Sequence, residues 1–204
     1  MEKPIAPLLL ALGLLAALLA QPAPAAAPDE GDPTATVARF QSELLGVWKA
    51  DIGFRERFRR LEKPVKTTHD LAYMARFSLG SVWEDLSEEE RSRFVDVFGR
   101  LMVGRYAERF ADYTGARFER TGSQELGARG YMVSTELVKS DGERVRLDYI
   151  LNRQEEGWRI ANVLADGVSE LAMQRSDFTE AARKWDIERL IQGLEGRIEE
   201  MAEE

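Results

Sequence analysis

The spacing of the apolar residues changes near Gly115, and this change constrains the fold more than any other feature of the sequence. Before it, over residues 87–113, apolar side chains recur every three or four positions, which is typical of an amphipathic helix. After it, from Arg117 to Leu151, apolar and polar residues alternate, as they do in a strand with one buried face. A helical block followed by a block of strands predicts an α+β fold.

Two helices are expected at the start of the helical block. Residues 34–50 carry apolar side chains at helical spacing, and Thr34 or Thr36 is available as the N-cap. A second, shorter helix around residues 54–61 should stop at Pro64, because proline lacks the N–H group that a helix interior requires.

Two further helices follow in the same block. Asp70 is placed to cap the first of them, and Gly80 is placed to end it. The second should begin at Ser87, which stands three residues before Glu90 in the spacing of a capping box. The apolar stripe of this long helix is wide and consists of Phe94, Val97, Phe98, Leu101, Met102, Tyr106 and Phe110.

The alternating segment predicts a meander of four antiparallel strands. Two strands are expected at residues 117–124 and 129–139, and a hairpin turn at Asp141-Gly142 leads into the third. A turn at Glu156-Gly157 leads into the fourth, after which the sequence returns to helices, the last of them capped by Asp186. We expect a curved sheet covered by helices on one face, with an apolar cavity between the sheet and the helices.

The first residues have the features of a secretory signal peptide. A lysine near the start precedes an apolar run, and small residues and prolines follow that run. The run is too short to span a bilayer comfortably. We therefore expect a cleavable signal peptide at residues 1–25, a disordered lead-in at 26–33 and a single domain over 34–204. The sequence has no cysteine for a lipid anchor or a disulfide, so we expect a soluble protein of the periplasm.

The formal net charge of −8 disfavours two classes of partner. Affinity for nucleic acids and for anionic membranes comes mainly from clustered Lys and Arg, and the charge balance of this chain is the opposite. We therefore expect no nucleic-acid partner. An acidic surface of this kind favours transient docking on basic patches of partner proteins.

The sequence offers little for metal or nucleophile chemistry. With one histidine, no cysteine and no EF-hand loop, we expect no metal site, no cofactor and no catalytic residue. His69-Asp70 could be a base with its orienting carboxylate, but we favour a helix start with an aspartate cap and an exposed imidazole. Asp148 and Asp166 remain as a carboxylate pair for an enzyme that would act in the cavity.

Glycines mark two places where the backbone has a special role. Asp166-Gly167 is interpreted as the corner where the last strand leaves the sheet, with glycine permitting the turn and Asp166 or Ser169 capping the next helix. Gly99 and Gly104 interrupt the long helix. They indicate either close packing against a neighbour or room for a ligand beside the helix.

Three long strings carry a family resemblance. They are HDLAYMARFSLGSVWEDLSEEERSRFVDVFGRLMVGRYAERFADY, WRIANVLADGVSELAMQRSDF and DIERLIQGLEGRI. The residues that stand out in them are Asp70, Met74, Leu79, Gly80, Trp83, Phe94, Phe98, Tyr106, Ala107, Trp158, Ile160, Val163, the run Asp166-Gly167-Val168-Ser169, and Arg175. Together they resemble the toluene-tolerance or MlaC-type family of periplasmic lipid-binding proteins, over nearly all of the mature chain.

The resemblance implies a carrier rather than an enzyme. Such proteins are the soluble component of an ABC-type lipid transport system. The ligand would be a phospholipid, and the partners would be an outer-membrane lipoprotein/porin complex and an MCE-type ABC transporter of the inner membrane. Gln174 stands where the common form of the family has tyrosine, and SELAMQRSDF is closer to the branch associated with hopanoid biosynthesis. A hopanoid is therefore the alternative ligand.

The wall of the cavity is predicted from apolar residues of the helices, the strands and the corner. Two other classes of function are kept as alternatives: an enzyme of a cone-shaped fold that acts on a lipid or steroid-like substrate, and an interaction scaffold whose apolar stripe is filled core. The expected lipid-binding residues are Phe77, Trp83, Phe98, Met102, Tyr106, Val133, Leu147, Tyr149, Leu151, Val163, Val168 and Leu171.

Overall fold

The structure is a computed structural model that describes residues 31–108 and 115–203. The predicted signal peptide, residues 26–30 of the predicted lead-in and Phe110 of the long helix lie outside the described residues. None of the helices in the two described ranges combines the length and the hydropathy that a membrane span needs. The elements, in chain order, are α1 (Pro33–Trp48), α2 (Phe54–Thr68), α3 (Leu71–Leu79), the 3₁₀ helix η1 (Gly80–Asp85), α4 (Glu88–Glu108), β1 (Arg117–Glu125), the 3₁₀ helix η2 (Gly127–Arg129), β2 (Tyr131–Val138), β3 (Arg144–Gln154), β4 (Gly157–Ala165), β5 (Val168–Ser169), α5 (Glu170–Trp185) and α6 (Ile187–Met201).

The first two helices differ from the prediction at one end each. The N-cap of α1 is Asp32 and not a threonine, since its carboxylate accepts a hydrogen bond from the Thr34 N–H at 2.8 Å. Helix α2 does not stop at Pro64 but continues to Thr68. Its inward face holds the fully buried Leu61 and Val65 on either side of the proline, so tertiary packing outweighs the local preference.

The predicted caps of the next helices are confirmed. The Asp70 carboxylate accepts a hydrogen bond from the Tyr73 N–H at 3.1 Å at the start of α3, and Gly80 ends that helix with φ of 56°. Ser87 and Glu90 form the predicted capping box of α4: the Ser87 N–H donates to the Glu90 carboxylate at 2.8 Å, and the Glu90 N–H donates to the Ser87 hydroxyl at 3.3 Å.

The sheet is an antiparallel meander of five strands in the order β1-β2-β3-β4-β5, one more than predicted. The additional strand β5 has two residues, which pair with Leu164 and Ala165 at the end of β4. Alternation of apolar and polar residues cannot reveal a strand of two residues. The β3–β4 turn falls one residue earlier than expected, since Gln154 pairs with Gly157.

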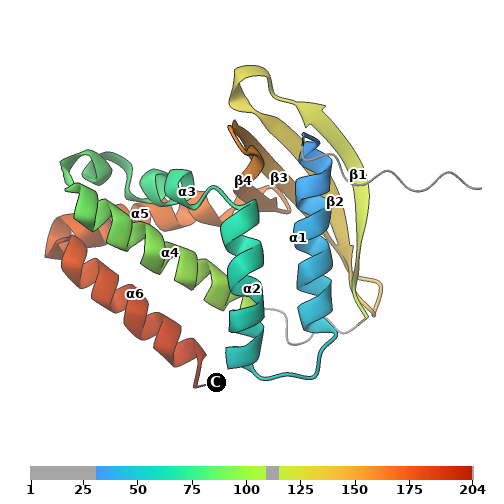
Figure 1. Ribbon diagram of the computed structural model, residues 1–204, viewed down its shortest axis with the longest axis horizontal. Coiled ribbons are helices and arrows are strands. Elements are labelled where there is room, and N and C mark those ends of the chain that lie inside the picture. The colour runs from blue at the N-terminus through green and yellow to red at the C-terminus, as the bar shows by residue number, and fades with distance from the viewer. Residues whose placement is uncertain (1–30, 109–114, 204) are drawn as a thin grey trace, which may run out of the picture.

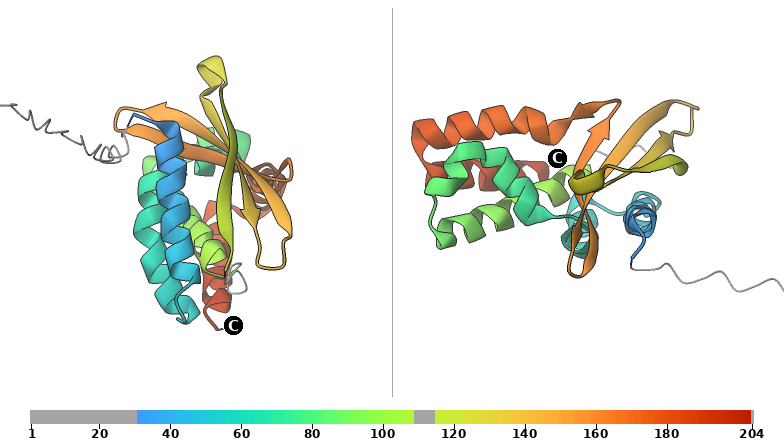
Figure 2. Two further views of the ribbon diagram at one scale, coloured as in Figure 1. Left: turned by 90° about the vertical axis from the view of Figure 1, so that its right-hand side faces the viewer. Right: turned by 90° about the horizontal axis from the view of Figure 1, so that it is seen from above.

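The helices form two groups around the sheet. Helices α1 and α2 stand side by side in front of the strands, and α3 to α6 gather at the opposite end of the molecule (Figures 1 and 2). Each group has its own hydrophobic core: α3 to α6 pack on one another, while α1 and α2 pack with the sheet. Met102 of α4 contacts both cores. The arrangement confirms the predicted α+β fold, in which helices and sheet enclose the space described next.

Candidate functional site

A cavity of about 130 Å³ lies where the two cores meet. Most of its lining side chains are apolar, and the exposed Ala165 and Val168 place its mouth at the corner between β4 and α5. The lining residues are Leu44 and Trp48 of α1, Met74 of α3, Phe98, Met102, Arg105 and Tyr106 of α4, Phe118, Leu137, Leu147, Tyr149, Asn162, Val163, Ala165 and Val168 of the sheet, and Glu170, Leu171 and Gln174 of α5.

Eight of the twelve residues expected in the wall line this cavity. They are Phe98, Met102, Tyr106, Leu147, Tyr149, Val163, Val168 and Leu171. Alternation along β3 brings Leu147 and Tyr149 to the same face, and Val163 pairs with Tyr149 on the neighbouring strand. The period of the apolar residues therefore predicts which faces meet at the cavity.

The structure does not bring the other four residues to the cavity. Val133 and Leu151 are 1% and 0% exposed in the core that α1 and α2 form with the sheet. Phe77 and Trp83 pack against the core of the helical group instead. The Phe77 ring also lies 4.8 Å from the Arg175 guanidinium carbon, so this aromatic is held between α3 and α5.

The lining residues that the sequence analysis missed are of two kinds. The apolar ones occupy positions of predicted helices and strands, so periodicity could have suggested them: Leu44, Trp48, Met74, Phe118, Leu137 and Ala165. Arg105, Asn162, Glu170 and Gln174 are polar, and no periodic signal marks polar residues at a cavity.

The hydroxyl of Tyr149 is hydrogen-bonded on the side away from the cavity. The Gln41 amide donates to the Tyr149 hydroxyl at 3.2 Å and to the Thr135 hydroxyl at 3.1 Å. Burial raises the pKa of Tyr149 to about 12, so this phenol is neutral at physiological pH. The ring of Tyr149 thus contributes an apolar wall, and its polar end is satisfied on the other side.

His69 is buried at 3% exposure, and the expectation of an exposed imidazole is wrong. Its Nε2 lies 3.2 Å from the Tyr106 hydroxyl, its Nδ1 lies 3.0 Å from the Thr68 hydroxyl, and the Phe40 ring meets it edge-on at 4.7 Å. Removal from water lowers the pKa of His69 to about 3, so the imidazole is neutral. Sequence spacing could not place residue 69 beside residue 106.

The structure does not assemble Asp148 and Asp166 into a carboxylate pair at the cavity. Asp148 alternates with the lining residues of β3, so it lies on the opposite face of the sheet, where the Ser134 hydroxyl donates to it at 2.5 Å. Asp166 is exposed at the corner, where its carboxylate accepts the Arg146 N–H at 3.0 Å. In the described ranges, no three His, Asp or Glu side chains gather as they would to hold a metal ion.

The corner that follows β4 has the geometry of a tight turn into a helix. Asp166 and Gly167 both have left-handed backbones, with φ of 48° and 82°, which aspartate tolerates and glycine adopts freely. Ser169 is the N-cap of α5: its hydroxyl accepts from the Ala172 N–H at 3.0 Å and donates to the side-chain amide oxygen of Asn162 at 2.9 Å. The interpretation of Asp166-Gly167 as a corner is confirmed, with Ser169 as the cap.

The two glycines of α4 pack closely against neighbours. A Cβ atom on Gly99 would lie 3.0 Å from the Leu71 Cδ1, and one on Gly104 would lie 2.9 Å from the Met201 sulfur. Neither glycine lines the cavity. Of the two interpretations left open by the sequence, close packing is the correct one.

An ion pair crosses the mouth of the cavity. The Arg105 guanidinium on α4 donates a short hydrogen bond to the Glu170 carboxylate at the start of α5. Gln174 lies one turn further along α5, and its side-chain amide is within reach of both the Arg105 guanidinium and the Glu170 carboxylate. Three polar side chains from two helices therefore meet at the edge of a cavity whose other lining is mostly apolar.

The sequence is similar to those of known proteins. The sequence matches the family described as "MlaC protein" over residues 43–196. It is 25% identical to the intermembrane phospholipid transport system binding protein MlaC of Haemophilus influenzae over 127 residues, which cover 60% of this chain and 59% of that protein. The match thus spans less than two thirds of that relative's length.

A solved structure shares the fold. The phospholipid-binding protein from Ralstonia solanacearum, solved in complex with a phospholipid, superposes with a TM-score of 0.73 at 20% sequence identity, covering 84% of this chain and 99% of that one. At this identity the likeness shows the fold alone. Because the family match over residues 43–196 covers most of the sequence, the chain belongs to the MlaC family.

Proposed function

We propose that the protein is a periplasmic lipid-binding shuttle that carries a phospholipid between the outer membrane and an MCE-type ABC transporter of the inner membrane. The observation that carries the proposal is the apolar cavity between the sheet and the helices in a chain of the MlaC family. The Haemophilus relative is named for intermembrane phospholipid transport, and the Ralstonia protein was solved with a phospholipid bound. Export would use the signal peptide at residues 1–25.

In this proposal the ligand tails occupy the cavity and contact the wall predicted from the sequence. The cavity volume of about 130 Å³ lies below the roughly 300–1,000 Å³ of sites that enclose a ligand, so loading requires the walls to separate. The junction between two separately packed cores is the natural place for this movement, because each core can keep its own packing. Val133 and Leu151 would then contact the ligand only in the wider form.

The free energy of burying acyl chains explains why a carrier needs partners. One chain of about 15 methylenes contributes about 12 kcal/mol at about 0.8 kcal/mol for each methylene. Two chains would exceed the practical ceiling of non-covalent affinity before ordering and desolvation costs are subtracted. Unaided release into water would be very slow. Delivery therefore calls for docking on receiving complexes, here the inner-membrane transporter and an outer-membrane lipoprotein/porin complex.

A non-enzymatic role agrees with the placement of the ionisable residues. The alternative of an enzyme was built on His69, Asp148 and Asp166, and none of the three lines the cavity. Burial keeps His69 neutral behind the wall, where its ring nitrogens contact the hydroxyls of Thr68 and Tyr106. The carrier proposal assigns these side chains to positioning the wall and the corner.

Native mass spectrometry tests the proposal. Mature protein purified from a bacterial periplasm should carry a bound lipid that survives gentle ionisation and is released on activation. The mass of the released lipid identifies it as a phospholipid or as a hopanoid, the alternative suggested by the string SELAMQRSDF. Protein that reaches the periplasm folded but without any lipid, and that takes up none from vesicles, would contradict the proposal.

A further inference from the structure

Arg105 is a largely buried cation on the cavity wall. It is the only Lys or Arg among the lining residues of the described chain, and Glu170 is the only carboxylate. The Arg105 side chain is 17% exposed, whereas the Glu170 side chain is 40% exposed. The two members of the ion pair therefore differ in how much they depend on each other.

This difference in exposure decides which member can exchange its partner. A cation withdrawn from water requires a compensating anion, so Arg105 cannot lose Glu170 without a replacement. Glu170 is the first residue of α5, near the exposed Val168, and its carboxylate is hydrated when it turns toward solvent. An incoming anion can take the place of Glu170 on the guanidinium, and the carboxylate then becomes hydrated.

The side chains around Arg105 suit an amphiphile. Met102, Tyr106 and Leu171 line the same cavity as Arg105, so an apolar chain held in the cavity has a cation on its wall. Gln174 adds a polar amide at the same level. A guanidinium at the rim of an apolar floor matches a molecule with an anionic group at the end of a hydrocarbon tail.

We propose that Arg105 binds the phosphate group of the lipid, and that Glu170 occupies this position while the cavity is empty. The inference rests on the proposed function and specifies the ligand that the same cavity selects. A phosphodiester offers oxygens that a guanidinium binds in a bidentate manner. A neutral diacylglycerol or a hopanoid alcohol supplies no anion, so it must leave the Arg105–Glu170 pair closed across the mouth.

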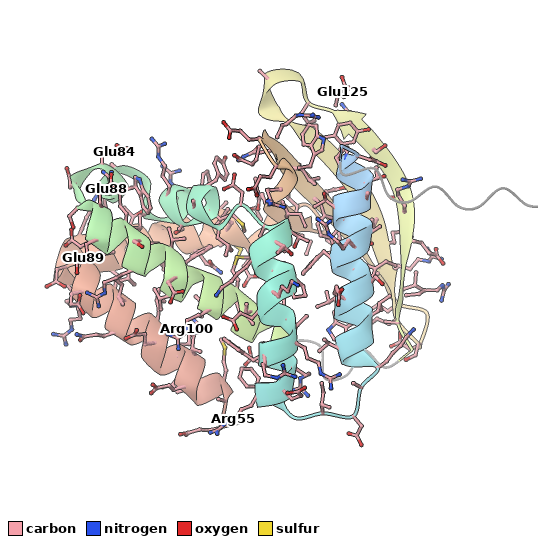
Figure 3. The ribbon with its side chains drawn as sticks, viewed as in Figure 1. Arg55, Glu84, Glu88, Glu89, Arg100 and Glu125 are labelled. Atoms are coloured by element: carbon pink, nitrogen blue, oxygen red, sulfur yellow. The ribbon has the colours of Figure 1, made fainter. Side chains whose placement is uncertain are left out.

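Two lipids that differ only in the headgroup test the proposal. Dioleoylphosphatidylglycerol and dioleoylglycerol have the same acyl chains, and only the first has a phosphate. Their binding to delipidated mature protein is measured by native mass spectrometry or by competition with a fluorescent lipid. The variants are Arg105→Gln, Glu170→Gln and the control Arg100→Gln, which removes a cation from the outer side of α4, near α6 (Figure 3).

The two variants of the ion pair have opposite expected effects. Arg105→Gln should weaken binding of dioleoylphosphatidylglycerol by about tenfold or more and leave binding of dioleoylglycerol unchanged, because a charge-assisted hydrogen bond is lost. Glu170→Gln should strengthen binding of dioleoylphosphatidylglycerol, because the competing carboxylate is gone. Both variants break the same ion pair, so a loss of stability alone cannot produce changes of opposite sign. Arg100→Gln should match the wild type for both lipids.

Failure of the inference is distinguishable from failure of the proposed function. If the wild type binds both lipids equally and Arg105→Gln changes neither, the phosphate site is overturned while the lipid-binding proposal stands. If Arg105→Gln and Glu170→Gln weaken both lipids to the same extent, the ion pair only holds the fold and the inference is again overturned. Protein that binds neither lipid overturns both proposals.

Discussion

The Nε2 atom of His69 lies 3.2 Å from the hydroxyl oxygen of Tyr106, and this contact links a buried neutral imidazole to the cavity wall. The Tyr106 ring faces the cavity, and the histidine stands behind it against Phe40. Because the imidazole is removed from water, the pKa of His69 falls to about 3 from its ordinary value of 6.5. The sole histidine of the sequence is therefore a positioning residue whose charge state affects stability.

Acidification should destabilise the protein through His69. Below pH 6.5 the imidazole is protonated in the unfolded chain, whereas in the folded chain it stays neutral down to a pH of about 3. The unfolded state therefore binds more protons, and the free energy of unfolding decreases as the pH is lowered. This group alone should remove about 2 kcal/mol between pH 7 and pH 5. Urea unfolding at both pH values measures the change.

His69→Gln is the matched variant for this measurement, because glutamine keeps a polar side chain without a titrating ring. It should be less stable than the wild type at pH 7, because a buried hydrogen bond to Tyr106 is lost. Its stability should change less between pH 7 and pH 5. Equal losses in the two proteins would show that the pKa of His69 is not lowered in the folded state.

Filling the cavity should abolish lipid binding without unfolding the protein. Val163 lines the cavity beside Tyr149, its partner on the neighbouring strand, so the larger ring of Val163→Phe can extend into the cavity. We expect the bound lipid to disappear from native mass spectra, with stability unchanged or raised by up to about 1 kcal/mol.

Val133→Phe is the control for the cavity-filling variant. Val133 is 1% exposed on the strand next to Tyr149 but does not line the cavity. The same substitution there should cost about 1–3 kcal/mol, because a filled core has no space for the ring. Equal losses of stability in the two variants would show that side chains fill the space at Val163 in solution, which would contradict the cavity.

Periodicity predicted most of this fold, and the exceptions have tertiary causes. The change from a helical to a strand period and the caps at Asp70 and Ser87 are local signals, and both were confirmed. Pro64 lies within a helix because its neighbours Leu61 and Val65 are buried, which no local rule contains. Strand β5 exists only because the corner turns back on β4.

The cavity was predicted in part for a similar reason. Alternation indicates which residues share a face of a strand, but not which of them a helix covers. It therefore could not show that Tyr149 lines the cavity while its partner Val133 is packed in the core. The polar rim was missed because Arg105 and Glu170 are 65 residues apart and neither follows an apolar pattern. Pairing of this kind is set by how α4 and α5 pack, and sequence spacing does not contain it.

Gly130 should tolerate substitution poorly. Its φ is 101°, and a Cβ atom there would lie 2.1 Å from the Leu151 carbonyl oxygen, which is backbone and cannot move without separating β2 from β3. We expect Gly130→Ala to cost at least about 3 kcal/mol. Gly142→Ala shares the positive φ of 90° but has no atom within 4 Å of the new Cβ, so it should cost only about 1–2 kcal/mol. Denaturant titration of both variants separates the clash from the backbone strain, and equal costs would contradict this account.

Gly104→Leu should destabilise the protein without changing how much lipid it binds. The added side chain must displace Met201 and the Phe58 ring, whose nearest atoms lie 2.9 and 3.8 Å from the position of a Cβ, and overpacking of this kind costs about 1–3 kcal/mol. Gly196→Ala on α6 meets no atom within 4 Å and should raise stability by up to about 1 kcal/mol, as expected for alanine in a helix. Thermal unfolding and native mass spectra are recorded for both variants. A Gly104→Leu protein with full stability but no bound lipid would contradict this account and would indicate that the glycine makes room for the ligand.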